Sequence, residues 1–283
     1  MNPTLQLTKG AYQILRRFIK AFSLSFVVML AAGTCSAFGM PTEGSVEAKS
    51  KIAAVVIDDF GNDMLGTKEM MELPIPFTAA VMPFLPTSKR DAQWAHRSGR
   101  DVIIHLPMEP VKGKKSWLGP GAITVDLPDD EIRRRVEAAI ADVPYAIGMN
   151  NHMGSKATAD PRVMRIVLQV CKERGFFFLD SRTSSKSVIP ALGKELGVEV
   201  VHNGLFFDEV YTIRHISKQV FRFNKLLQDQ GACVAIGHVG PPGQKTAALL
   251  KQYYDEVKGK VEFVPVSKLI TVKDRLVNRS LSP

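Results

Sequence analysis

A buried strand runs into two adjacent carboxylates in the segment Ile52-Ala53-Ala54-Val55-Val56-Ile57-Asp58-Asp59-Phe60-Gly61. An apolar, partly β-branched run of this length is typical of a strand covered on both faces, as in parallel sheets. In α/β folds the carboxyl ends of such strands carry the functional residues. We expect Asp58 and Asp59 to point to opposite sides of the strand and to have different roles. A surface turn is the alternative, since Asp and Gly are turn residues.

Segments of similar apolar character recur along the chain, spaced so that helices fit between them. The expected strands are Ile52–Ile57, Thr78–Met82, Val102–His105, Ala146–Met149, Phe176–Leu179, Val198–Val201, Cys233–Ile236 and Val261–Val264. This βα alternation continues for about 220 residues and predicts one parallel-stranded domain, a (β/α) barrel. An open doubly wound sheet is the alternative. No Gly-x-Gly-x-x-Gly or phosphate-loop sequence follows a strand, which argues against nucleotide binding.

Three segments between the expected strands carry apolar residues at helical spacing. The first follows Asp129-Asp130-Glu131 and the second starts at Asp160-Pro161, which are helix-start signals. Their apolar faces are Ile132, Val136, Ala139 and Ile140, then Val163, Ile166, Val167 and Val170, and in the third Ile213, Ile216, Val220, Phe223 and Leu227.

The positive charge of the chain is spread along its length. Of the formal charge of +9, Lys9, Arg16, Arg17 and Lys20 account for four, and residues 1–39 contain no acid. The remaining Lys and Arg residues are scattered among acids without interleaved aromatic residues, so we expect no nucleic-acid binding. A mildly cationic surface suits anionic polymers of the cell envelope.

The amino-terminal segment has the pattern of a secretory signal peptide. Basic residues up to Lys20 precede the apolar run Ala21–Ala32, and a small-residue stretch follows with a suitable cleavage site after Ala37. An uncleaved membrane anchor over Ala21–Phe38 is the alternative. Lipidation of Cys35 is a weaker one, because Thr34 stands where a lipoprotein signal normally has Gly or Ala.

The expected domain organisation follows from this segment. Residues 1–39 are the signal peptide or anchor, 40–50 a linker, 51–270 the barrel and 271–283 a carboxyl-terminal tail. We therefore expect an exported protein, periplasmic or facing the periplasm and tethered to the inner membrane, that touches the membrane only through its amino-terminal segment. The sequence does not indicate an oligomeric state. Cys171 and Cys233 have apolar neighbours and are expected to be core residues.

Histidines and aspartates gather at the ends of the expected strands. Four of the six histidines lie there, together with three aspartates: His105, His152, His202, His238, Asp58, Asp59 and Asp180. One such histidine alone is more often structural, but in a barrel all these ends converge on one mouth. Asp and His are ligands of catalytic zinc, which takes three protein ligands and one water. The metal lowers the pKa of that water to about 7. A second carboxylate as base and a histidine as acid would complete the hydrolysis of an amide or ester.

With these residues, the chain from Lys51 to Leu269 resembles the divergent polysaccharide deacetylase family, a distant branch of the NodB-type carbohydrate esterases. The motifs that carry the resemblance are Ile-Asp-Asp-Phe-Gly (57–61), His-Leu-Pro-Met-Glu-Pro (105–110), Asn-His-Met-Gly-Ser (151–155), Asp-Ser-Arg-Thr (180–183) and Ala-Ile-Gly-His (235–238). The resemblance implies an α/β fold, a single distorted barrel with about seven βα units.

The resemblance also implies roles for residues. Asp58 would be the catalytic base and Asp59 a ligand of a divalent metal, most often zinc, together with two histidines. The superfamily spaces its histidine pair i, i+4, whereas Glu109 follows His105 at that spacing and Lys156 follows His152. The second histidine ligand is therefore expected to be His152.

Two further motifs imply supporting roles. His238 matches the histidine that protonates the leaving group, or else it is a third histidine ligand. Asp180 and Arg182 match a pair that orients a catalytic group, with a structural salt bridge as the alternative. Phe60 interrupts the usual Asp-Asp-Gly.

The function expected from this resemblance is an exported, metal-dependent hydrolase that removes acetyl groups from an N-acetylated envelope polysaccharide. Glu109, Asn151 and His202 are expected to contact substrate, and Trp117 lies on a long loop where it would stack on a sugar ring or simply pack the loop. The alternative function is a catalytically weak or inactive module that binds a glycan or a partner, since fold does not guarantee chemistry. A two-metal phosphoesterase would need a denser set of Asp and His.

Overall fold

The computed structural model describes residues 51–271, which form one compact unit. The expected signal peptide or anchor, the linker and nearly all of the expected tail lie outside this part of the chain. Within residues 51–271, no helix is long and apolar enough to cross a membrane.

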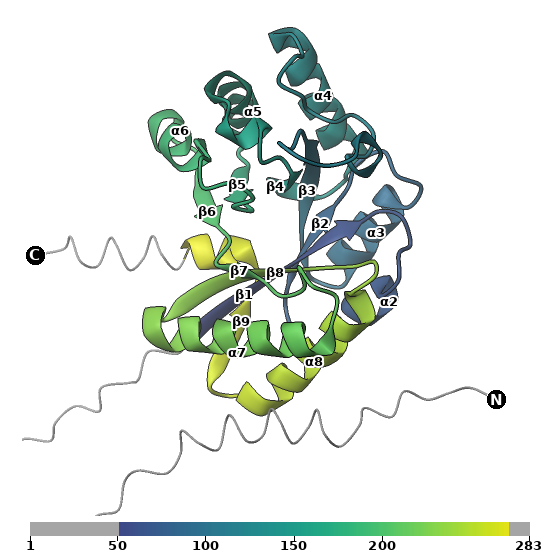
Figure 1. Cartoon of the computed structure of the whole chain (residues 1–283), viewed down its shortest axis with the longest axis vertical. Coiled ribbons are helices and arrows are strands. Elements are labelled where there is room, and N and C mark those ends of the chain that lie inside the picture. Colours follow the sequence, from purple (N-terminus) through teal and green to yellow (C-terminus); the bar gives the residue numbers. More distant parts are fainter. Residues whose placement is uncertain (1–50, 272–283) are drawn as a thin grey trace, which may run out of the picture. The chain divides into compact units, whose positions relative to one another are not determined.

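The strands of this unit form one parallel sheet whose hydrogen-bonded path is β6-β5-β4-β3-β2-β1-β8-β7, and β9 pairs with β1 (Figure 1). The strands are β1 (Lys51–Phe60), β2 (Thr78–Val81), β3 (Asp101–Met108), β4 (Ala146–Met153), β5 (Phe177–Asp180), β6 (Val200–His202), β7 (Leu205–Phe206), β8 (Ala232–His238) and β9 (Val261–Val264). Lys51–Ala54 of β1 pair with β9, whereas β2 pairs with β1 farther along, from Val56.

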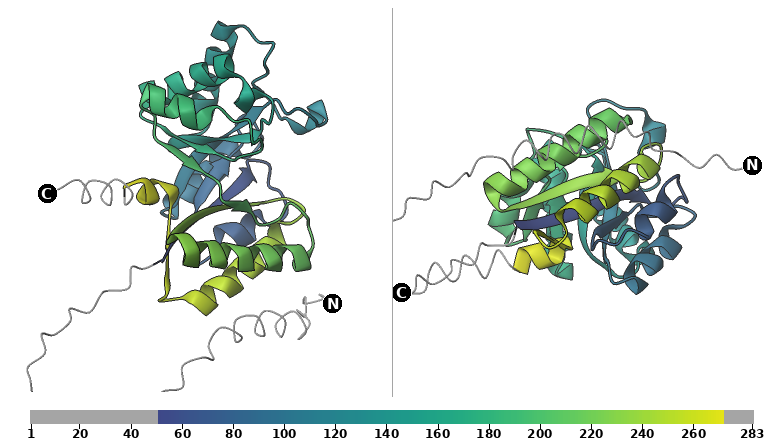
Figure 2. Two further views of the ribbon diagram at one scale, coloured as in Figure 1. Left: turned by 60° about the vertical axis from the view of Figure 1, so that its left-hand side comes forward. Right: turned by 90° about the horizontal axis from the view of Figure 1, so that it is seen from below.

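The chain itself links the two ends of the sheet. After β6, the Asn203 amide donates to the Asp180 carbonyl of the β5 side at 2.9 Å, and the Gly204 amide donates to the Val234 carbonyl of β8 at 2.9 Å. One peptide bond therefore carries the chain from one edge strand to the other, and the sheet curls into an incomplete barrel (Figure 2). The prediction of a distorted (β/α) barrel is confirmed, and the open doubly wound sheet is wrong.

All eight expected strands are present; Val261–Val264 has the predicted bounds, whereas the ends of the other seven differ from those predicted. β3 and β4 run three and four residues past their expected ends at His105 and Met149. The expected sixth strand, Val198–Val201, is observed as Val200–His202, and the two-residue β7 was not predicted. Consequently His105 and His152 are strand residues, held by a hydrogen-bonded ladder rather than by loops.

Helices cover the outer side of the sheet (Figures 1 and 2). They are α2 (Thr67–Met71), α3 (Ser88–Arg97), α4 (Asp129–Asp142), α5 (Pro161–Arg174), α6 (Ile189–Leu196), α7 (Ile213–Gln230) and α8 (Gly243–Val257), with 3₁₀ turns η1 (Lys115–Trp117) and η2 (Ala157–Ala159). α5 shows how local sequence sets these bounds. The Asp160 carboxylate accepts from the Val163 amide, Pro161 begins the helix, and Gly175 ends it in the left-handed conformation.

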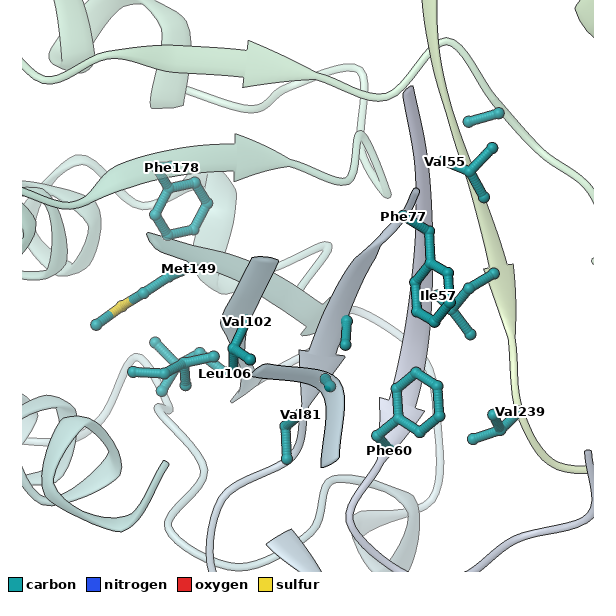
Figure 3. Close-up of a cluster of buried hydrophobic side chains, with 14 of the residues drawn as sticks. Val55, Ile57, Phe60, Phe77, Val81, Val102, Leu106, Met149, Phe178 and Val239 are labelled. Carbon is teal, nitrogen blue, oxygen red and sulfur yellow. The ribbon is translucent and has the colours of Figure 1, made fainter. Parts of the chain in front are cut away.

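Buried apolar side chains form one layer on each face of the sheet. The outer layer lies between strands and helices and includes Val55, Ile57, Phe60 and Phe178 (Figure 3). The three predicted helix faces lie in this layer, with Ile140, Ile166 and Ile213 only partly buried.

The inner layer fills the barrel with strand residues of the opposite parity. It includes Val56, Ile103, Leu179, Val201 and Ile236, and Val266 and Leu269 of the helical residues 266–271 close it at the amino ends of the strands. Because side chains alternate along a strand, the residue two positions further on points into the same lumen. Those residues are polar in each case: Asp58, His105, Ser181, Asn203 and His238. The apolar barrel thus ends in a polar mouth.

Candidate metal centre and active site

A bulge in β1 brings two neighbouring carboxylates to the same mouth. Ile57 pairs with Ala79 and Phe60 with Val81, so β1 has one more residue than β2 across this interval. Asp59 takes a left-handed backbone conformation with φ 69°. Asp58 and Asp59 both line one cavity of about 250 Å³. The expectation that they point to opposite sides is therefore wrong, because the bulge breaks the alternation of the strand.

The bulge is held from outside by α3. The Gly61 amide donates to the buried Asp91 carboxylate at 3.0 Å, and Thr87 donates to the same oxygen at 2.7 Å. A non-glycine residue in the left-handed region is strained by about 1 kcal/mol or more and persists only where its surroundings over-determine it. These contacts supply that constraint next to Asp59.

Three ligand atoms from three strands converge at the mouth. Asp59 Oδ1 lies 3.2 Å from His105 Nε2 and 3.1 Å from His152 Nδ1, and the two imidazole nitrogens are 3.0 Å apart. His105 in β3 and His152 in β4 face the lumen two positions apart, since His152 pairs with Pro107. Metal–ligand bonds of ~2.0–2.1 Å place neighbouring ligands roughly 2.9–3.4 Å apart in octahedral or tetrahedral sites. The triangle therefore has the size of a metal site.

Hydrogen bonds on the far side of each ring aim the lone pairs of the imidazoles at that triangle. His105 Nδ1 meets the Asn150 amide oxygen at 2.8 Å, and His152 Nε2 meets the backbone carbonyl of Trp117 at 3.0 Å. Both partners are acceptors, so each of these ring nitrogens carries the hydrogen, and the other nitrogen of a neutral imidazole is left as an acceptor. Asp59 Oδ1 is buried and has no hydrogen-bond partner. Three acceptors that face one another fit a bound cation.

The site shifts the pKa values of the two carboxyl groups in opposite directions. Burial raises the pKa of Asp58, and this effect outweighs the nearby imidazoles. Burial also acts to raise the pKa of Asp59, but the hydrogen bonds and positive charge that His105 and His152 offer when they are protonated hold that pKa well below its usual range. Asp58 Oδ1 accepts from the Asn150 side-chain amide at 2.9 Å. Adjacent carboxyl groups whose environments push their pKa values apart are suited to different roles, here base and ligand.

His238, which is partly buried, forms a hydrogen-bonded pair with the buried Asp208. His238 Nδ1 lies 2.7 Å from Asp208 Oδ1, while Asp208 Oδ2 accepts from the His238 amide at 3.0 Å and from Thr246 Oγ1 at 2.7 Å. Burial alone would lower the pKa of His238, but the hydrogen bond and charge of Asp208, with the other carboxylates, raise it to about 10. His238 also pairs with Asp58 across β1 and β8. A protonated imidazole therefore stands beside the cluster of Asp58, Asp59, His105 and His152.

Asp208 was missed by the sequence analysis. It follows Leu205-Phe206-Phe207, an apolar run that ends in an acid as β1 does. The signal was present, but β7 has only two paired residues and the run reads equally well as a loop. Asn150 was also not predicted as a site residue, although it lies two positions before His152 in β4 and so faces the same side of the strand.

The cavity brings together some of the predicted residues. Its walls are Asp58, Asp59, His105, Asn151, His152, Met153, Ser181, Thr183, Phe206, Glu209 and His238. Glu109, His202, Asp180 and Arg182 are not part of these walls. Trp117 contributes its backbone carbonyl to His152, and its side chain is 59% exposed above the loop.

Glu109 and Asp180 have structural contacts instead. Glu109 accepts from the Val125 amide at 2.9 Å and from Lys156 Nζ at 2.7 Å, so it fastens the long loop after β3. Asp180 is buried and has the parity of the outer layer. It accepts from the Arg182 amide and from Ser187 Oγ, both at 2.8 Å. It therefore contacts the backbone of Arg182. His202 has the same outward parity and is exposed.

Comparison with known proteins gives the chain a family context. A family model described as divergent polysaccharide deacetylase matches residues 55–270. An uncharacterised protein of Haemophilus influenzae is 34% identical over 222 residues, which cover 78% of this chain and 77% of that protein. The uncharacterised protein YibQ of Escherichia coli is 34% identical over 217 residues, covering 77% of this chain and 66% of YibQ.

Solved structures share the fold. An uncharacterised protein from Agrobacterium tumefaciens has a TM-score of 0.73 at 20% identity, over 79% of this chain and 90% of that chain. A proposed polysaccharide deacetylase from Mycobacterium smegmatis has a TM-score of 0.51 at 13% identity, over 85% and 95%. At these identities the likeness establishes the architecture alone.

Proposed function

The chain belongs to the divergent polysaccharide deacetylase family, and on that premise we propose that it is a metal-dependent hydrolase that removes acetyl groups from an N-acetylated glycan of the cell envelope. The observation that carries the proposal is the triangle of Asp59, His105 and His152, with Asp58 on one side and the His238–Asp208 pair beside it. A metal site, a base and an acid in one cavity are the components that amide hydrolysis needs.

Asp59, His105 and His152 would hold the cation, and zinc suits two imidazoles and one carboxylate. When bound, the cation supplies a Lewis acid that polarises a water molecule and the acetyl carbonyl. Asn150 orients both His105 and Asp58, because its side-chain oxygen accepts from His105 and its side-chain nitrogen donates to Asp58. Such outer contacts fix ring orientation and ligand basicity.

Asp58 takes a proton from the attacking water in this proposal. Its raised pKa makes it a stronger base than an exposed aspartate, and its burial keeps bulk water from competing for the proton. His238, protonated at neutral pH, donates a proton to the departing amine. Asp208 and Thr246 hold the ring in place for that transfer.

The place of action is part of the proposal. Support comes from the basic and apolar amino-terminal segment, which has the features of an export signal. An exported enzyme of this kind would meet envelope polysaccharide rather than cytoplasmic sugar.

Acetate release from acetylated oligosaccharides by the purified full-length protein, loaded with zinc, tests the proposal. We expect turnover that stops on chelation and falls at least about 100-fold in Asp58→Asn, since general-base catalysis contributes ~10²–10⁴-fold. Asn retains an oxygen that can accept from Asn150, so the fold should survive. Retained zinc with no acetate release from any acetylated glycan would instead support a binding module.

A further inference from the structure

Building on the proposed function, we infer that the acetylated glycan carries anionic groups, carboxylate or phosphate, and that Arg182 binds one of them at the rim of the cavity. Arg182 lies between Ser181 and Thr183, which both line the cavity. Its own side chain is exposed and belongs to the rim.

The backbone at Arg182 is held in a strained conformation. Its φ is 56°, in the left-handed region that non-glycine residues rarely adopt. The Arg182 amide donates to the buried carboxylate of Asp180 at 2.8 Å, and Ser181 is bound to Asn151 through both its amide and its hydroxyl at 3.0 Å. Strain that neighbouring contacts over-determine is concentrated at functional sites. The direction in which Arg182 leaves the backbone is thus fixed.

Within residues 51–271, Arg182 and three lysines of the loops after β3 and β5 have no ion-pair partner. Among residues 51–271, no ion pair involves Arg182, Lys112, Lys114 or Lys186. The arginines of α4 and α5 differ, because there Arg133 pairs with Glu173, Arg134 with Glu131 and Arg165 with Glu195. The charge of these arginines is therefore paired, whereas the charge on the loops beside the cavity is not.

These cations sit on the loops after β3 and β5, and both of these loops contact the segment that ends β4 and the loop after it. The Val111 amide donates to Ser155 Oγ at 3.0 Å, and Thr183 Oγ1 donates to the Met153 carbonyl at 2.8 Å. The one acid in residues 109–114, 154–157 and 181–187 is Glu109, which neutralises Lys156. The three loops form a cationic rim on one side of the mouth.

Another part of the cavity wall carries a negative charge, which gives the bound glycan a direction. Glu209 lines the cavity from the segment after β7 and is exposed. An anionic group is repelled there and attracted to the cationic rim. Arg182 suits that group because a guanidinium offers paired donors to carboxylate or phosphate oxygens. Lys114 Nζ lies 5.5 Å from the Trp117 ring centroid, so a sugar that stacks on the indole also meets a cation.

Binding to three N-acetylglucosamine oligomers tests the inference: a neutral one, one with alternating lactyl carboxylates and one with phosphate groups. The full-length protein carries Asp58→Asn so that nothing is turned over. We expect the preferred anionic oligomer to bind about tenfold more tightly than the neutral one at low salt, and to lose this preference at high salt. The anionic oligomer that binds more tightly identifies the group that is recognised, carboxylate or phosphate.

Variants of Arg182 separate charge from backbone effects. We expect Arg182→Gln to weaken anionic binding about two- to fivefold and to leave neutral binding unchanged, as is typical of one exposed charge pair. Arg182→Gly should lose the same affinity while it raises the unfolding midpoint, because glycine accepts the positive φ. Lys225→Gln removes a charge from the distal half of α7 and should change nothing.

Equal affinities for neutral and anionic oligomers, or an anionic preference that Arg182→Gln leaves intact, would overturn the inference. The proposed activity fails separately. Anionic binding without acetate release by the unsubstituted protein would refute the deacetylase but leave the inference standing. Acetate release without any preference for anionic oligomers would support the deacetylase and refute the inference.

Discussion

At the scale of single residues, the role available to each side chain depends on which of its polar atoms already has a hydrogen-bond partner. His105 and His152 each use one ring nitrogen for an acceptor outside the triangle, which leaves the other for Asp59 and a cation. Asp58 uses one oxygen for Asn150. The proposed ligand Asp59 and the proposed base Asp58 are thus distinguished by their contacts, although they are neighbours in sequence.

Exchange of each carboxylate for its amide separates these two roles. Asp59→Asn should lose most of its bound metal, because the amide supplies no charge to the triangle. Asp58→Asn should keep the metal and lose turnover. Metal content and acetate release, measured on the same preparations, give the comparison. Loss of metal in both variants would mean that Asp58 is itself a ligand.

The Asp208–His238 pair makes a prediction about pH. The pKa of His238 is raised to about 10, so its proton is retained through neutral pH and lost as the pH approaches 10. The stabilisation by this pair is likewise complete below the ordinary histidine pKa of about 6.5 and disappears as the pH rises to about 10. Asp208→Asn should move the alkaline limb of kcat/KM towards pH 6.5. A pH–rate profile that is unchanged in Asp208→Asn would exclude His238 as the proton donor.

Most of the acidic and imidazole residues of the cavity were predictable because they stand where apolar strands stop. Asp58, Asp59, His105, His152 and His238 were all chosen on that ground, and the structure places them in one cavity. The face of the strand on which a side chain lies explains why two other predicted residues do not line the cavity. Asp180 and His202 also stand at strand ends, but they point outward, and a strand end located only to within one or two residues does not fix which face a side chain takes.

At the scale of elements, the β1 bulge sets the positions of Asp58 and Asp59 in the candidate metal site. Gly61 follows the bulge with φ 122°, and a Cβ there would lie 2.9 Å from the Met82 carbonyl oxygen. Gly61→Ala should therefore shift Asp59 and lower both stability and metal affinity. We expect the free energy of unfolding to fall by about 1–3 kcal/mol in denaturant titrations.

Gly99→Ala is the matched control for that substitution. Gly99 also has a positive φ, 71°, but apart from its chain neighbours no atom lies within 4 Å of the place that an added Cβ would take. It should lose about 1 kcal/mol from strain alone and retain metal. If both variants keep metal equally well, the bulge does not govern the position of Asp59.

Helices were easier to predict than the bulge. Asp160-Pro161 at the start of α5 is a local signal that can be read from a few neighbouring residues. The bulge depends on pairing with β2 and on Asp91 of α3, which are remote in sequence. The passage from β6 to β7 is likewise a matter of tertiary pairing, because no helix intervenes and the chain changes partner within two residues.

At the scale of the whole molecule, the proposed metal ties together strands from different parts of the chain. Asp59, His105 and His152 belong to β1, β3 and β4. A ligand that binds only the folded state stabilises it by ~2.7 kcal/mol when its free concentration is about 100 times Kd. For a domain of this size that corresponds to a rise in Tm of roughly 5–10 °C. Addition of a chelator should reverse the rise in the unsubstituted protein and have no effect on His105→Ala.

The most direct test of the account is the metal content of the purified full-length protein, measured by elemental mass spectrometry after dialysis. We expect about one divalent cation per chain, as in a site with three protein ligands. His105→Ala and His152→Ala should lose it, whereas His202→Ala, which removes a strand-end histidine outside the cluster, should keep it. Absence of metal from the unsubstituted protein after loading, or its retention in both cluster variants, would contradict the central claim.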